Sequence, residues 1–266
     1  MKQFYKNIKL TFRKIRLGIM VYLEYRSSLL FYTLSSFAWA ISSIVLQKFL
    51  FEEIVELKGW TFGEFALLNG IYNLAFAFFI MFSWGSVYEE FRPAVREGRL
   101  DRILTKPLSH KFFLTFGSFD IVGFFHLLPS FFIIIYASRF LTFDFSILNI
   151  SLSIIYFLIG QFILNSIVYL FYATTFWLTS AEHISSAFWT LESQSKTPLE
   201  VLPRFVRAAF LSIIPIGFVA YIPAKALLGE LPLVFLPYTI FFILFLTFVN
   251  RTVWNLGVRR YESVSS

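Results

Sequence analysis

Long uninterrupted apolar runs are the feature that most constrains this chain. Runs of about eighteen or more hydrophobic residues recur along its 266 residues, and an α-helix needs roughly that length to cross the hydrocarbon core of a bilayer. Only 15% of the residues are charged, whereas a soluble domain carries about 25%. A membrane β-barrel would show segments of about ten residues with alternating polarity, and the sequence lacks that pattern. The sequence therefore predicts one all-α polytopic membrane domain over residues 1–266.

Five apolar runs are clear candidate spans, and a basic region precedes them. The spans cover residues 28–51, 65–87, 112–137, 147–172 and 233–250. Residues 1–26 contain seven basic residues. Most of these recur at steps of three and four, beside an apolar stripe with the same spacing. This pattern predicts an amphipathic interfacial helix that lies among the lipid headgroups of the cytoplasmic leaflet.

Basic residues outside the spans predict the orientation of the chain. They concentrate near both termini and in segment 88–111, whereas the loops 52–61 and 138–146 carry one each. The positive-inside rule therefore places both termini in the cytoplasm, which requires an even number of crossings. Membrane lipids with anionic headgroups are the expected partners of these charges. No basic region stands apart from the membrane, so we expect no nucleic-acid partner.

The region 178–232 leaves two alternatives for the missing crossing. In one, residues 178–207 stay in the cytoplasm and residues 208–229 cross the membrane, although prolines and a glycine interrupt them. In the other, residues from about 180–197 form a short polar fifth span and residues 198–232 form an external re-entrant segment. Hydropathy alone favours the first alternative. The second implies a buried or pathway-lining element, because non-helical backbone at membrane depth must be covered by protein or line a water-filled cavity.

The sequence lacks the signatures of several catalytic and metal sites. It contains no G-x-x-x-x-G-K-[ST] loop, no H-E-x-x-H pair and no cysteine, and its three histidines are scattered. We therefore expect this chain itself to be no enzyme and to hold no metal.

Polar residues inside the predicted spans are candidates for a substrate pathway or for helix packing. Asn69 and Asn73 share one face of the second span, and Gln161 and Asn165 share a face of the fourth. Asp120 lies eight residues into the third predicted span, roughly 12 Å deep at helical rise. Intramembrane carboxylates are functional candidates by default. Side chains of these types also bond neighbouring helices, so both roles stay open.

Segment 88–111 interrupts the apolar pattern with charges, prolines and a glycine. Pro93 suits the first turn of a short helix, and Gly98 is placed to end that helix in the left-handed conformation. Asp101 can cap a second short helical turn, which Pro107 ends. Exposed apolar residues form one edge of that turn. This punctuation predicts a compact elbow parallel to the membrane surface, with a docking face.

The same segment resembles the loop between the second and third spans in type-2 permease subunits of ATP-binding-cassette (ABC) transporters. In one branch of that family the loop reads approximately R-x-G-x-L-D-x-x-L-x-[KR]-P. The residues that match are Arg96, Gly98, Leu100, Asp101, Leu104, Lys106 and Pro107. Downstream, "TFW" at 175–177, "IIPIGF" at 213–218 and "LLG" at 227–229 resemble the proline-marked region before the family's last span. The resemblance covers essentially the whole chain in matching order.

The resemblance implies a fold and a function. It implies six transmembrane helices, an N-terminal interfacial helix, a cytoplasmic coupling elbow and the external re-entrant element at 198–232. The chain would be the permease subunit of an exporter in the bacterial cytoplasmic membrane, forming the pathway as a homo- or heterodimer. ATP and Mg²⁺ would bind separate cytoplasmic ATPase subunits, which leaves no cofactor in this chain. The ATPase-coupling candidates are then Arg92, Arg96, Gly98, Arg99, Leu100, Asp101, Leu104, Lys106 and Pro107.

Two other function classes stay open beside the exporter. An intramembrane enzyme, such as a protease or lipid transferase, needs acids and histidines clustered at one depth. Asp120 and His126 are the candidates for such a cluster. A membrane scaffold is the other class, and it does not require a structured elbow.

Overall fold

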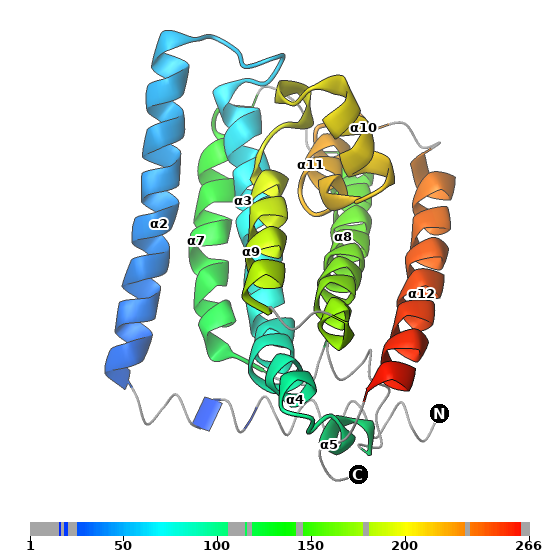
Figure 1. Cartoon of the computed structure of the whole chain (residues 1–266). Helices are drawn as coiled ribbons and strands as arrows, with labels where there is room; N and C mark the ends of the chain where they lie inside the picture. The colour runs from blue at the N-terminus through cyan, green and yellow to red at the C-terminus, as the bar shows by residue number, and fades with distance from the viewer. Residues whose placement is uncertain are drawn as a thin grey trace.

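The computed structural model describes residues 16, 19–20, 26–105, 115, 119–141, 146–177, 181–231 and 235–261. These residues fold into helices without a β-strand, which confirms the all-α prediction for the described part of the chain. Five of the helices are long and apolar enough to cross a membrane, and they run side by side in Figure 1. They are built on α2 (Arg26–Glu53), α3 (Phe62–Phe79), α7 (Ile121–Ser138), α8 (Ile147–Ala173) and α12 (Phe235–Arg260). The interfacial helix predicted over 1–26 lies almost entirely outside the described residues.

The second long helix extends well beyond its predicted end at residue 87. α3 begins at the cap residue Thr61, whose side chain accepts a hydrogen bond from the Glu64 N–H while the Glu64 side chain bonds back. The helix then continues through a π-helix, η1 (Ile80–Phe91), into α4 (Arg92–Arg96). The apolar rod reaches from Phe62 to Val95. The first part of segment 88–111 therefore prolongs the second span and does not form a separate elbow.

The third predicted span is interrupted near its start. Phe119 and Asp120 are not helical, and α7 begins at Ile121. Asp120 has an extended backbone, with φ −111° and ψ 116°, and its side chain accepts a hydrogen bond from the Val122 N–H. The expectation that Asp120 lies eight residues inside this helix was wrong, because its short carboxylate caps the first turn.

A short helix returns the chain from one end of the bundle to the other. α8 ends at the lower end in Figure 1 and α12 begins at the upper end. Between them α9 (Ala181–Glu192) and η3 (Ser193–Lys196) run upward. The twelve residues of α9 rise about 18 Å, less than the ~30 Å hydrocarbon core of a bilayer. This length explains why α9 is not among the five long apolar helices.

The residues after η3 fold into a cap at the upper end of the bundle (Figure 1). The cap contains η4 (Leu199–Val201), α10 (Arg204–Ser212), η5 (Ile216–Phe218) and α11 (Tyr221–Leu227). The alternative in which 208–229 forms a transmembrane helix is wrong, since this range is broken into short pieces and α11 has only seven residues. The prolines and glycine that interrupt the apolar run stop a continuous helix from forming.

The cap packs closely against the upper half of α8. Ile216, Phe218 and Ala220 are fully buried. At Gly160 the two backbones approach so closely that a Cβ atom would lie 2.2 Å from the Phe218 carbonyl oxygen. About two turns earlier in α8, the Ser153 hydroxyl donates to the Pro223 carbonyl at 2.9 Å. The cap is therefore part of the core of the molecule.

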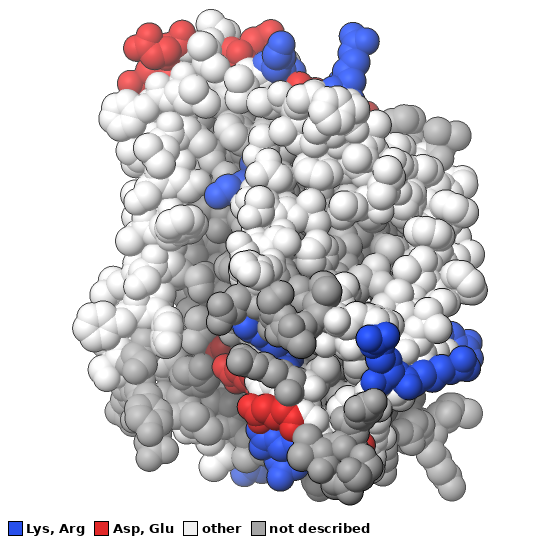
Figure 2. Space-filling model, viewed as in Figure 1, with Lys and Arg blue, Asp and Glu red and all other residues white. Residues whose placement is uncertain are grey.

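The surface has the polarity expected of a membrane protein. In Figure 2 the charged side chains gather at the upper and lower ends, and a broad band between them is almost free of charge. Large apolar side chains are exposed on the long helices, among them Phe31, Ile135, Leu158 and Phe248. Side chains of this kind are stable in contact with lipid, whereas a soluble protein rarely exposes so many together.

Candidate functional site

The candidate site is the lower turn, residues 92–105, which follows the second long helix. Gly98 has a φ of 65°, as the sequence predicted for a left-handed helix end. The Arg99 N–H donates to the Ala94 carbonyl at 2.8 Å, and the Gly98 N–H donates to the Val95 carbonyl at 3.4 Å. This pair of bonds is the Schellman motif, which closes α4 and redirects the chain into α5 (Asp101–Leu104). The turn is therefore a defined structure.

Two details of the predicted turn are wrong. The residue that precedes α5 is Leu100, which has no side-chain capping bond, and Asp101 is the first helical residue. The apolar edge of α5 also faces inward for the most part. Leu100 is fully buried and Ile103 is 5% exposed, whereas Leu104 is exposed. Apolar residues in this turn mainly hold it to the bundle, because burial of such side chains is stabilising.

The ends of two helices, α8 and α12, hold the lower turn in place. The Phe91 ring packs 6.0 Å from Phe176, just after α8, and 5.8 Å from Trp254 of α12, between ring centroids. The Leu100 N–H donates to the Tyr261 hydroxyl at 2.8 Å. No sequence signal identified Trp254 or Tyr261, because both contacts join segments that are far apart along the chain.

The exposed face of the lower turn carries charges of both signs. Arg99 forms an ion pair with Glu97, and both side chains are about half exposed. A hollow of about 380 Å³ opens beside them, lined by Glu89, Glu90, Pro93, Ala94, Arg99, Arg102 and Ile103. Arg92 is partly buried, and Arg96 ends α4. Lys106 and Pro107 lie outside the described residues. The hollow is thus a concave surface with charged groups of both signs, which a second protein could contact.

The polar residues predicted inside the spans lie at helix contacts. On α3, Asn69 is buried and accepts a hydrogen bond from Ser43 of α2 at 3.4 Å, while its carbonyl accepts one from the Asn73 amide at 2.7 Å. On α8, the Asn165 side chain accepts a hydrogen bond from Ser83 of η1. The Asn165 amide donates to the Gln161 carbonyl at 2.8 Å. The structure thus joins Asn69 to Asn73 and Gln161 to Asn165 by hydrogen bonds within one helix each.

Asp120 is tied to the second long helix by its backbone. Its N–H donates to the Met81 carbonyl at 2.9 Å. The start of α7 is therefore joined to the π-helix η1. Among the described residues, no group of three or more histidine, aspartate or glutamate side chains is placed to hold a metal ion.

A cavity of about 260 Å³ lies between α2, α3, α7 and the upper end of α9. Asn73 and His126 line it, together with several aromatic side chains. Glu192, at the end of α9, also lines it and is only 3% exposed. The Tyr72 hydroxyl donates to the Glu192 carboxylate at 3.1 Å. Lys196 lines the cavity as well as Glu192. No ion pair joins them, because η3 replaces the α-helical turn that would have brought them together.

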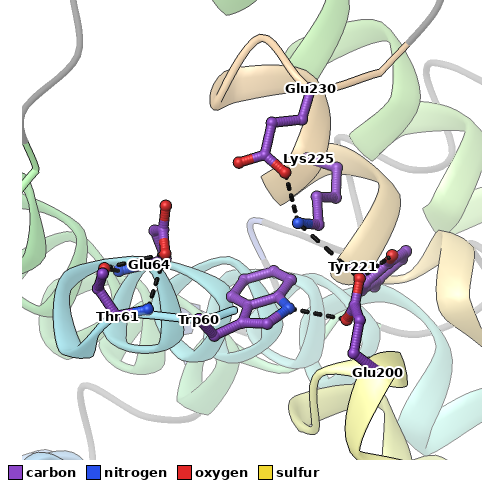
Figure 3. Close-up of polar contacts among 7 residues, drawn as sticks. All are labelled: Trp60, Thr61, Glu64, Glu200, Tyr221, Lys225 and Glu230. Carbon is purple, nitrogen blue, oxygen red and sulfur yellow. Dashed lines mark hydrogen bonds and ion pairs between the residues drawn. The ribbon is translucent and has the colours of Figure 1, made fainter. Parts of the chain in front are cut away.

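At the upper end, Glu200 joins the cap to the start of α3 (Figure 3). Its carboxylate accepts hydrogen bonds from Trp60 Nε1 at 2.7 Å and from the Tyr221 hydroxyl at 2.6 Å. Lys225 Nζ lies 3.9 Å from the same carboxylate and 4.3 Å from the centroid of the Trp60 ring, and it also pairs with Glu230. Burial, and then the nearby Glu200 charge, raise the pKa of Tyr221. Tyr221 therefore remains a hydrogen-bond donor at physiological pH.

The comparisons with known proteins give one match, and it covers most of the chain. Residues 37–265 match the family model described as ABC-2 family transporter protein. Searches of curated proteins and of solved structures gave no match. The matched range includes the lower turn, the cap and the five long helices, except for the first residues of α2.

Proposed function

The chain belongs to the ABC-2 transporter family, and from that premise we propose that it is the permease subunit of an ATP-driven exporter. It is an integral membrane protein of a transport family, and its five long apolar helices fit that family. The subunit pairs with a second permease subunit, identical or related, and the two enclose the substrate pathway. Separate cytoplasmic ATPase subunits bind ATP and Mg²⁺ and supply the energy.

In this proposal α9 is the fifth of six crossings in the bacterial cytoplasmic membrane. The direction of α9 in Figure 1 supports this assignment, because five crossings alone would leave the start of α2 and the end of α12 on opposite sides. The lower end of the bundle faces the cytoplasm, since the basic residues of the lower turn and of the end of α12 lie there. The cap 198–231 then faces the outside. Asn69, Asn73, Gln161, Asn165 and Asp120 remain candidates for pathway or packing roles.

The observation that carries the proposal is the firm attachment of the lower turn. Buried Leu100 and the Phe91 ring contacts fix the turn to the ends of α8 and α12. A partner that pushes on the exposed face, including Arg99, Asp101 and Leu104, therefore moves several helices together. Closure and reopening of the ATPase subunits can in this way switch the permease between inward-facing and outward-facing states.

Substitution of Gly98 by valine tests the proposal. Valine is strained at a positive φ, by about 1–2 kcal/mol, so the lower turn must change shape. With membrane insertion intact, we expect Gly98→Val to reduce co-purification of the proposed ATPase partner, or to uncouple ATP hydrolysis from transport. The effect should be about tenfold or more, because the surface that binds the partner is displaced.

The matched control is Gly59→Val at the opposite end of the bundle. Gly59 also has a positive φ, 85°, and an added Cβ there would meet no atom within 4 Å. Gly59→Val thus has a similar backbone penalty without touching the lower turn. Equal complex formation and transport by both variants and the unchanged protein would contradict the proposal.

A further inference from the structure

The cavity among α2, α3, α7 and α9 has two features of a ligand site: aromatic walls and one buried acidic group. We propose that this cavity binds a small organic cation with one aromatic ring, and that the ammonium group of the cation lies at Glu192. The proposal names a substrate class for the proposed permease. It rests on that function only for the claim that the bound cation is also transported.

The aromatic walls come from different helices. Tyr72 and Phe76 of α3 stack with ring centroids 6.2 Å apart and an interplanar angle of 13°. Trp189 of α9 meets Phe76 edge to face at 6.1 Å, and Trp39 of α2 lines the cavity from the other side. Aromatic faces attract cations, and this attraction strengthens where water is excluded. Such walls also bind an aromatic ring by stacking.

Glu192 supplies the charge that selects a cation. Its side chain is 3% exposed and accepts a hydrogen bond from the Tyr72 hydroxyl. The ion pairs found among the described residues do not include Glu192. A buried carboxylate with one neutral donor is costly, and a positive ligand compensates that cost. The cavity therefore favours a ligand with an ammonium group over a neutral ligand of the same shape.

Lys196 lines the same cavity, and its positive charge allows cationic and anionic ligands to be distinguished. Its ammonium competes with a cationic ligand for the field of Glu192, and the same ammonium would attract an anionic ligand. Removal of each charge therefore has opposite consequences for the two ligand classes. For a cation, loss of the Glu192 charge weakens binding and loss of the Lys196 charge strengthens it. For an anion, both signs reverse.

The size and depth of the cavity restrict the ligand further. A volume of about 260 Å³ lies just below the usual range of drug-binding cavities, about 300–1,000 Å³, so it suits one ring with a short ammonium arm. Phe76 lies fourteen residues beyond the first residue of α3, about 20 Å along the helix. This depth fits a free amine better than the headgroup of a lipid, which lies at the interface.

The test measures binding of benzyltrimethylammonium to the purified full chain in phosphatidylglycerol nanodiscs, by calorimetry, without ATPase or ATP. Neopentylbenzene is the neutral ligand of the same shape, and benzylsulfonate is the anionic comparison. We expect the cation to bind about tenfold or more tightly than either. Absent binding of the cation, or equal or tighter binding of either comparison ligand, overturns the proposal.

Two variants test the assigned residues. We expect Glu192→Gln to weaken cation binding about tenfold or more and Lys196→Met to strengthen it several-fold. Glu53→Gln, on the exposed end of α2, is the control and should leave binding unchanged. If Glu192→Gln does not fold, the sign of the Lys196→Met effect still decides. Unchanged or weaker cation binding by Lys196→Met overturns the proposal.

Two further arms separate related conclusions. Binding is also compared in phosphatidylcholine and phosphatidylglycerol nanodiscs at high salt, which screens the different surface charges of the two lipids. Under these conditions a cavity that accepts choline headgroups binds the probe more weakly in phosphatidylcholine, whereas a cavity for free amines does not. Both results are consistent with an ammonium-binding site, and they show whether its natural ligand is a lipid headgroup or a free amine. Stimulation of ATP hydrolysis by the cation is then measured in the assembled complex. Binding without stimulation supports the site and contradicts the claim of transport, and the Gly98 experiment tests the permease function independently.

Discussion

At the residue scale, Tyr261 shows how a single contact joins distant parts of the chain. Its hydroxyl accepts a hydrogen bond from the N–H of Leu100, 161 positions away. Leu100 is the residue that directly precedes α5. The end of α12 therefore holds the lower turn through one backbone bond.

We expect Tyr261→Phe to loosen the lower turn without unfolding the bundle. The loss of one hydrogen bond costs about 1 kcal/mol, and the buried N–H of Leu100 is left without this partner. Hydrogen exchange followed by mass spectrometry should show faster exchange of the peptide that contains Leu100. Tyr32→Phe, on the exposed surface of α2, should not change that peptide. Unchanged exchange in Tyr261→Phe would show that the bond does not hold the turn.

The residues also show where sequence reasoning succeeds and where it stops. The left-handed conformation of Gly98 was predictable, because only the local backbone decides it. The burial of Leu100 was not predictable, since it depends on helices that arrive later in the chain. Asp120 was assigned to the inside of a span because hydropathy averages over a window. An average of this kind cannot reveal one capping carboxylate.

At the scale of elements, the contact between α8 and the cap depends on the absence of a side chain at Gly160. The Phe218 carbonyl occupies the space that a Cβ would need. The cap also has only short helices, so its order depends on contacts of this kind and not on its own hydrogen bonds.

We expect Gly160→Val to displace the cap and to lower stability by about 1–3 kcal/mol, because neither backbone can yield easily. Thermal unfolding measures the loss. Limited trypsin digestion should also cut faster after Arg204 and Arg207 of α10. Leu158→Val, on the exposed side of the same helix, is the control and should behave like the unchanged protein. Equal digestion of the two variants would contradict this account of the cap.

The long helices were predictable from hydropathy, but their ends were not. α12 extends to Arg260, ten residues beyond its predicted end, because its last turn carries the basic residues Arg259 and Arg260 and can continue past the apolar core into water. The π-helix η1 was not predicted, since its pairing depends on packing against other helices and not on local propensity. α9 was uncertain from sequence because residues 180–197 are polar for a membrane span. The places of Glu192 and Lys196 around the cavity became clear only in three dimensions.

At the scale of the whole molecule, the number of crossings depends on the side of the membrane that the cap faces. The chain contains no cysteine, so single cysteines can be introduced into it without background. Arg204 in the cap and Arg102 in the lower turn are both exposed. These two positions report on opposite ends of the bundle.

If α9 crosses the membrane, Arg204→Cys should react with a membrane-impermeant maleimide in intact cells. Arg102→Cys should react only after permeabilisation, because the proposed orientation places the lower end in the cytoplasm. The measurement is the labelled fraction of each variant before and after permeabilisation. Protection of Arg204→Cys in intact cells would place residues 178–207 in the cytoplasm and exclude the sixth crossing.

The π-helix η1 has a consequence for variation in chain length. Its hydrogen bonds reach one residue further back than those of an α-helix, so each turn contains more chain. Deletion of one residue between Ile80 and Phe91 can therefore be accommodated by closing one of these turns into an α-turn. Relatives one residue shorter in this stretch are compatible with the same packing of α3 above it and the same lower turn below.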